Sequence, residues 1–102
     1  MMRSGVLYLV AESPETHGVF DVPKETRRMV YCTIKSVGYQ EYYRAMENAL
    51  RPSLVFVLAD YAEYQDEKTC VYEGKRYQII RTYITAQQTI ELTVEEAKAY
   101  VG

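Results

Sequence analysis

The feature that most constrains this chain is a run from Thr26 to Val37 in which two kinds of side chain alternate. One face carries Arg28, Val30, Cys32, Ile34 and Ser36, and the other carries Met29, Tyr31, Thr33 and Lys35. Strict alternation of this kind marks a β-strand with one buried face. The sequence therefore predicts a sheet built around this strand.

The alternation stops at Gly38 and gives way to helical spacing. Apolar or small side chains then recur at i, i+3, i+4 and i+7, namely Tyr42, Ala45, Met46, Ala49 and Leu50. This spacing predicts an amphipathic helix of about three turns, with Glu41 in the first turn, where the helix dipole favours a carboxylate. Pro52 ends it, because the residue before a proline avoids helical angles. Residues 38–52 are thus a predicted helical insertion between strands.

Five further segments have strand patterns: Val6–Ala11, Ser53–Asp60, Lys68–Glu73, Arg76–Tyr83 and Thr89–Glu95. Between the first two strands, Glu12–Gly18 is rich in Pro, Ser and Gly and is predicted to be a loop. Val19–Val22 is predicted to be a short extended piece that ends at Pro23. After the last strand, Thr93 and Glu96 have capping-box spacing, which indicates either a short helix or a frayed tail.

One hairpin is predicted in more detail. Gly74-Lys75 has glycine at the first central position, the pattern of a type II′ turn. This turn would pair Glu73 with Arg76 and Tyr72 with Tyr77, placing an opposite-charge pair beside an aromatic pair.

Six strands and one helix in 102 residues predict a single, mainly β domain over residues 1–102. An antiparallel sheet of this size hides its edges most economically as a small barrel or as two packed sheets. We therefore expect a small antiparallel barrel or sandwich of about six strands, with one short helix in a long loop.

Composition excludes several classes of function. The net charge is −2 and the pI about 5.4, which argues against tight binding to nucleic-acid phosphates. No apolar run approaches the roughly 18 residues of a membrane span, and the first residues lack a signal-peptide layout. We expect a chain used in a cytoplasm, in which Cys32 and Cys70 are buried free thiols.

We expect neither catalysis nor a cofactor nor a metal. His17 is the only histidine, and it lies in the predicted loop without a clear partner. Glu63, Asp66 and Glu67 lack calcium-site spacing, so a solvated charge run is the better interpretation. Phosphate-binding glycine loops and nucleophile elbows are also missing from the sequence.

Tyrosine is the unusual residue, with 11 Tyr against 2 Phe and no Trp. Tyrosine suits protein interfaces, because its ring is apolar and its tip polar. The predicted helix carries Tyr39, Glu41, Tyr43, Arg44 and Glu47, which we consider candidates for subunit contacts or for lining a channel. A plainer interpretation remains open, in which the helix caps one end of the barrel and buries Met46 and Leu50.

The order of these segments resembles the head–tail joining proteins of tailed bacteriophages, also called head-closure or head-completion proteins. The likeness rests on the strand Val30–Ser36 with the tyrosine-bearing helix from Tyr39 to Ala45, on the hairpin Glu73–Tyr83, and on the closing strand Thr89–Glu95. It covers residues 18–95.

The resemblance implies a structural virion protein at the head–tail interface, made in the host cytoplasm. Such subunits form a ring under the portal or its adaptor after DNA packaging, close the channel and present a surface to the tail-completion protein. The ring would hold or pass double-stranded DNA without sequence-specific binding, and residues 36–53 would be the channel loop.

A second hypothesis is a small cytoplasmic barrel of SH3-like or OB-like type that binds a peptide or single-stranded nucleic acid. A nucleic-acid barrel places aromatic and basic side chains on one sheet face. In this sequence the candidates for such a face are Arg76, Tyr77, Arg81 and Tyr83.

Overall fold

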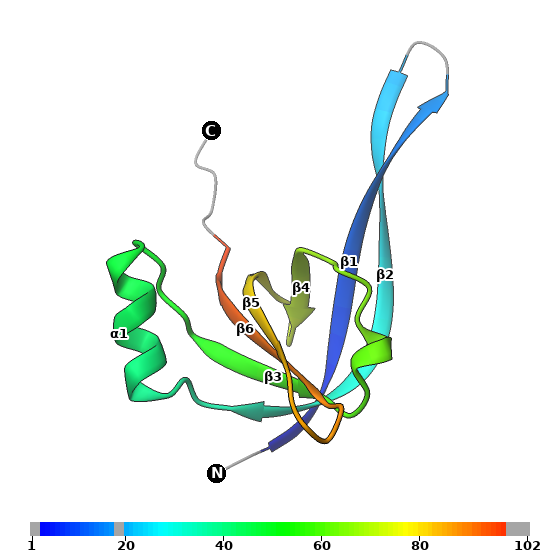
Figure 1. Ribbon diagram of the computed structural model, residues 1–102. Coiled ribbons are helices and arrows are strands. Elements are labelled where there is room, and N and C mark those ends of the chain that lie inside the picture. Colours follow the sequence, from blue (N-terminus) through cyan, green and yellow to red (C-terminus); the bar gives the residue numbers. More distant parts are fainter. Residues whose placement is uncertain (1–2, 18–19, 98–102) are drawn as a thin grey trace.

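The structure is a computed structural model that describes residues 3–17 and 20–97. Six strands form one closed antiparallel barrel in the order β1-β2-β3-β6-β5-β4 (Figure 1). The elements in chain order are β1 (Arg3–His17), β2 (Phe20–Lys35), α1 (Tyr39–Glu47), β3 (Leu54–Leu58), the 3₁₀ turn η1 (Tyr61–Glu63), β4 (Thr69–Tyr72), β5 (Lys75–Ile84) and β6 (Ile90–Glu96). The predicted mainly β barrel with one short helix is confirmed.

The core fills the barrel with the inward side chains of every strand. Phe56 lies at its centre, with ring centroids 5.1 Å from Tyr72 and 6.0 Å from Tyr77. Gly5 faces the first of these rings, and a Cβ built there would lie 2.9 Å from a carbon of Tyr72. Only glycine fits at this position of β1 without moving the aromatic core.

The alternation predicted for the long central strand is confirmed. Val30, Cys32 and Ile34 are buried in the barrel, whereas Met29 is 51% and Tyr31 is 71% exposed on the outer face. This strand is β2, and its inward side chains meet Leu7 and Leu9 of β1 in one core. The period-2 pattern predicted this strand correctly because one face of β2 is buried in the core and the other is exposed to solvent.

The predicted turn of the β4–β5 hairpin is displaced by one residue, so the predicted cross-strand partners are wrong by two residues. The turn residues are Glu73 and Gly74, with φ of 51° and 77°, so the turn is of type I′ and not II′. Tyr72 pairs with Lys75, and Tyr77 pairs with Cys70. Because the small Cys70 lies opposite Tyr77, the rings of Tyr72 and Tyr77 are diagonal neighbours, and both reach Phe56.

The largest departure from the prediction is a long hairpin that projects from the barrel (Figure 1). β1 and β2 pair without a break from Arg3 opposite Ile34 to His17 opposite Phe20. We call residues 11–17 and 20–26 the arm. The predicted loop over Glu12–Gly18 is therefore wrong for residues 12–17, which are strand, and β2 runs through Pro23. Residues 18 and 19 lie outside the described part of the chain.

Two facing prolines explain why the arm tolerates residues that usually mark a loop. Pro14 and Pro23 are directly opposite each other in the ladder. In an antiparallel pair, opposite residues either exchange both hydrogen bonds or make none, and proline has no N–H. The two prolines therefore form a non-hydrogen-bonded pair whose nitrogens face the two outer edges, and the ladder loses no bond.

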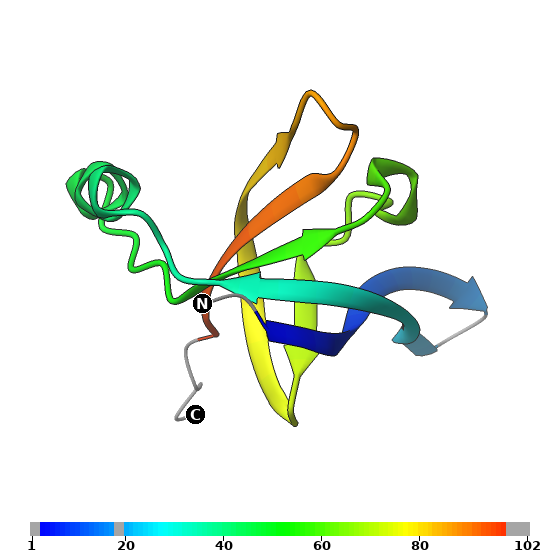
Figure 2. The ribbon, with the colours of Figure 1, turned by 90° about the horizontal axis from the view of Figure 1, so that it is seen from below.

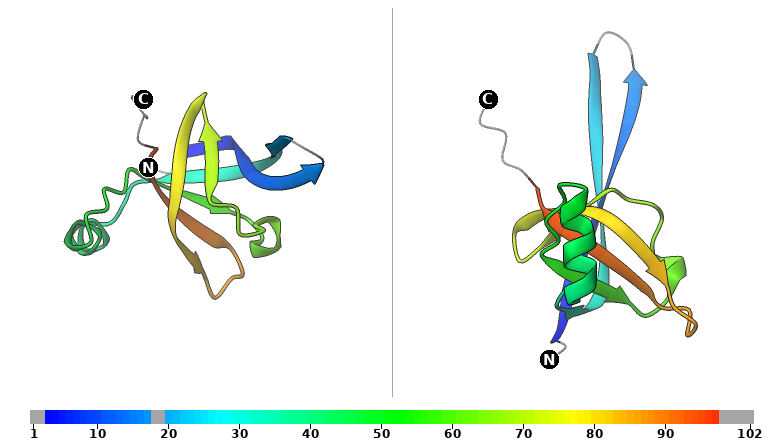
Figure 3. Two further views of the ribbon diagram at one scale, coloured as in Figure 1. Left: turned by 90° about the horizontal axis from the view of Figure 1, so that it is seen from above. Right: turned by 60° about the vertical axis from the view of Figure 1, so that its left-hand side comes forward.

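The helix and the last strand follow the sequence closely. α1 leaves the barrel on a different side from the arm (Figures 2 and 3). β6 continues through Thr93 to Glu96, so the capping-box pattern starts no helix within the described residues. Any helix after Ala97 lies outside them.

Candidate interaction surfaces

The helix α1 is held beside the barrel wall by one carboxylate. Glu41 Oε1 accepts a hydrogen bond of 3.2 Å from Arg81 Nη1 and one of 3.0 Å from Thr93 Oγ1. Both donors lie on the outer faces of β5 and β6, so this carboxylate spans from the helix to two strands. Glu41 lies in the first turn of α1, where the helix dipole favours a carboxylate, and its side chain points to the barrel.

The interpretation that α1 caps the barrel and buries Met46 is wrong. The helix contains no buried residue, and Met46 is 42% exposed. Leu50 is only partly buried. Between the helix and the wall is a cavity of about 200 Å³, lined by residues that include Arg44, Ala45 and Ile80. The helix adds little to the core and stands as a separate projection.

The far side of α1 displays a tyrosine cluster. Tyr39 is 81% and Tyr43 is 58% exposed, and their ring centroids are 5.5 Å apart. Tyr42 meets Tyr43 edge to face at 6.0 Å. Together with Val37 these rings line a hollow of about 230 Å³.

The structure therefore divides the five predicted site residues. Tyr39 and Tyr43 lie together on the outside of the helix, and Arg44 lines the cavity on its inner side. Glu47 is exposed at the last turn, and Glu41 is bound to the barrel. Glu41 thus positions the helix, and the others remain available for contacts.

A second surface was not singled out from the sequence. Val6, Tyr8, Met29 and Tyr31 are all exposed on the outer face of β1 and β2. Val6 is opposite Tyr31, and Tyr8 is opposite Met29, so the four side chains form one continuous patch, which we call the wall patch. The alternation of β2 places Met29 and Tyr31 outside, but only the β1–β2 register brings Val6 and Tyr8 beside them.

Charged side chains lie next to the wall patch, where the arm begins. Arg76 Nη2 is 2.7 Å from Glu25 Oε1, and Arg27 Nη2 is 3.8 Å from Glu25 Oε2. The hydrogen bond from Arg76 lowers the pKa of the Glu25 carboxyl. Glu25 therefore interacts mainly with Arg76. Arg27 is half exposed, and its distance to Glu25 is longer.

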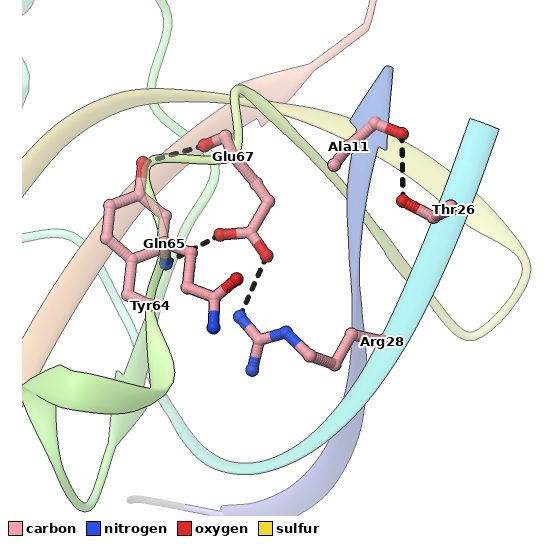
Figure 4. A network of polar contacts seen from close by, with 6 residues as sticks. All are labelled: Ala11, Thr26, Arg28, Tyr64, Gln65 and Glu67. Atoms are coloured by element: carbon pink, nitrogen blue, oxygen red, sulfur yellow. Dashed lines mark hydrogen bonds and ion pairs between the residues drawn. The ribbon is translucent and has the colours of Figure 1, made fainter. Parts of the chain in front are cut away.

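The base of the arm is fastened from the inner side by a buried carboxylate (Figure 4). Glu67 is 6% exposed and accepts hydrogen bonds of 2.8 Å from Arg28 Nη2 and 2.7 Å from the backbone N–H of Gln65. The hydroxyl of Tyr64 donates to the Glu67 carbonyl at 2.6 Å, and burial raises the pKa of Tyr64 to about 12. The prediction of a solvated charge run is wrong for Glu67.

The two cysteines are free and buried, as predicted. Burial raises the pKa of the Cys32 thiol to about 11 and that of the Cys70 thiol to about 12. Both thiols are therefore protonated near neutral pH, and protonated thiols are poor nucleophiles and poor metal ligands.

Within residues 3–17 and 20–97, no group of three or more His, Cys, Asp or Glu side chains could hold a metal ion. The described part of the chain also has no helix long and apolar enough to cross a membrane. In comparisons with protein families and with curated proteins, no match to this sequence was found. The described residues present two groups of exposed tyrosines and a projecting arm, and these are the candidate contact surfaces.

Proposed function

We propose that this chain is a ring-forming structural protein of the head–tail connector of a tailed bacteriophage. It docks under the portal or its adaptor, closes the DNA channel after packaging and provides the surface to which the tail attaches. The observation that carries the proposal is a closed barrel with two projections, the arm and α1, that leave on different sides (Figure 3).

A ring needs such a division of surfaces. Each subunit in a ring meets two neighbours through two different patches, and it meets further proteins above and below. The tyrosine cluster of α1 and the wall patch are separate surfaces rich in the residue that interfaces favour. A barrel that folds without burying either projection can present both without losing its core.

The charge of the chain suits a channel that retains DNA and later releases it. With a net charge of −2, the subunit has no general attraction for phosphate. The basic side chains on the outer wall of β5 are also neutralised, because Arg76 bonds to Glu25 and Arg81 to Glu41.

The same contacts bear on the second hypothesis, a small barrel that binds peptide or single-stranded nucleic acid. Tyr77 lies in the core against Phe56, and so it does not share a face with Arg76, Arg81 and Tyr83. The predicted nucleic-acid face on β5 is therefore reduced to Arg76, Arg81 and Tyr83, and both arginines are paired with carboxylates. Within this alternative the peptide-binding form has the stronger support, because the wall patch exposes two tyrosines and a methionine side by side.

The test is size-exclusion chromatography with light scattering, with and without the portal–adaptor complex of the same phage. The isolated chain should elute as a monomer or a weak associate, and it should form a ring on the complex that electron microscopy resolves. A stable, large homo-oligomer of the isolated chain at micromolar concentration would contradict the proposal, as would failure to bind the complex.

A further inference from the structure

The outer edge of β2 next to the arm has unpaired backbone groups at defined positions. Pro23 lies in a non-hydrogen-bonded pair, and the β1–β2 register continues unshifted from there to Ile34. Backbone groups therefore alternate along β2, and those of the odd-numbered residues face away from β1. In this part of the strand they belong to Glu25, Arg27, Met29 and Tyr31.

No other strand among the described residues occupies this edge. β3 pairs with β2 only from Thr33 to Lys35. The backbone hydrogen bonds found outside helices and strands in the described part of the chain involve none of Arg27, Met29 and Tyr31. The segment between η1 and β4, which contains Glu67, is tied to β2 through the side chain of Arg28, whose backbone groups face β1.

The free edge has two natural limits. At one end the pairing of β2 with β3 begins at Thr33, and at the other end Pro23 offers no N–H. The stretch between them, from Glu25 to Tyr31, is about as long as an ordinary strand. We call it the edge slot.

The side chains beside the edge slot define what fits there. Residues whose backbone faces the edge also project their side chains to the outer face, so Met29 and Tyr31 would flank an added strand with apolar surface. Arg27 would flank it with a positive charge, because its guanidinium is half exposed. Among the described side chains its carboxylate partner is Glu25 at 3.8 Å, which lies closer to Arg76.

We propose that the edge slot is a strand-addition site for an extended segment of another protein. The segment bonds through its backbone to Arg27, Met29 and Tyr31, and it carries an acidic side chain opposite Arg27 and apolar side chains opposite Met29 and Tyr31. Main-chain bonds supply affinity in this mode of recognition, and alternate side chains supply specificity. The site stands independently of the role in the phage connector.

The probe is a random dodecapeptide library made by mRNA display and selected on the immobilised chain. Enriched peptides should alternate apolar residues and carry one acidic residue at a fixed spacing from them. Their affinity is then measured by isothermal titration calorimetry against three proteins: the unaltered chain, Met29→Pro and Met29→Thr. Proline removes the outward N–H of residue 29 without touching a bond to β1, and threonine removes the methionine side chain but keeps that N–H.

Met29→Pro should weaken binding at least tenfold, and Met29→Thr should weaken it by much less. Arg27→Glu should select against the acidic peptides and favour basic ones. Equal binding to Met29→Pro and the unaltered chain would overturn the proposal, and so would a library that yields no binder. A homodimer of the unaltered chain that Met29→Pro abolishes would also overturn it, because the occupant would then be a second copy.

Hydrogen exchange keeps the proposal testable if Met29→Pro does not fold. In the unaltered chain the amides of Arg27, Met29 and Tyr31 should exchange fast, and bound peptide should slow them at least tenfold. The amides of Arg28 and Val30 face β1 and should be slow in both states. Unchanged exchange at the three odd-numbered amides in the presence of a bound peptide would contradict strand addition.

Discussion

At the scale of single residues, the most consequential contact joins Arg28 to Glu67. The two are 39 positions apart, so no local pattern relates them, and an acidic stretch in a loop is ordinarily solvated. Burial of Glu67 is tolerated because its carboxylate has both a guanidinium and a backbone N–H as partners. The contact connects the segment before β4 to the base of the arm.

Replacing Glu67 with alanine should lower the free energy of unfolding by about 3 kcal/mol, because the change leaves Arg28 and the Gln65 N–H without their acceptor. Urea denaturation followed by circular dichroism measures this. The matched control is Glu91→Gln, since Glu91 pairs with Lys35 at the surface and its loss should cost at most about 1 kcal/mol. Equal effects of the two variants would show that burial of Glu67 has no special weight.

The cysteines should be unreactive until the barrel opens. Both thiols are buried and have raised pKa values, so at pH 8 the native chain should react with Ellman's reagent far more slowly than a free thiol does. In denaturant both should react within minutes. Fast labelling of either cysteine in the native chain would mean that the wall of the barrel opens readily around β2 or β4.

At the scale of elements, local patterns predicted most strands and the helix, and long-range contacts decided the rest. The period of β2 and the helical spacing after Gly38 are local, and both appear where predicted. The arm was missed because Pro14 and Pro23 normally mark loops, and only their facing positions make them compatible with a ladder. The docking of α1 depends on Glu41 meeting Arg81 and Thr93, which helix periodicity does not encode.

Replacing Tyr39, Tyr43 and Arg44 together with serine should leave the thermal midpoint nearly unchanged, because α1 contains no buried residue. Under the proposed function, the same variant should yield filled heads that leak DNA or fail to take tails. Calorimetry and infectivity measure the two effects. Unfolding of the isolated subunit would make the segment structural, and fully infectious particles would refute its contact role.

The position of the helix should depend on Glu41 alone among its acidic residues. Glu41→Ala removes both bonds to the barrel, so the amides of α1 should exchange faster with solvent while those of β5 and β6 change little. Glu47→Ala serves as the control, since Glu47 is exposed. If both variants leave exchange in α1 unaltered, the helix is held by something other than this carboxylate.

At the scale of the whole molecule, the barrel and its arm have different sources of stability. The barrel is a closed sheet around a buried core. β1 and β2 contribute residues such as Leu7, Leu9 and Val30 to this core. The arm is a two-stranded ribbon, and such ribbons are marginally stable alone in water. Under the proposed function, contacts in the connector would stabilise a ribbon of this length.

Replacing residues 12–25 with Asn-Gly should remove the arm and spare the barrel. Ala11 and Thr26 would close the new hairpin as a hydrogen-bonded pair, and Asn-Gly suits the type I′ turn that such a pair needs. The shortened chain should keep a cooperative thermal transition, with some loss of stability because the bond between Glu25 and Arg76 is removed.

Under the proposed function the shortened chain should fail to form a ring on the portal–adaptor complex, measured by light scattering. If it folds and still forms the ring, the arm is not a subunit contact, and the case for a connector built on two projections fails. If it does not fold, the arm belongs to the stable core of the domain.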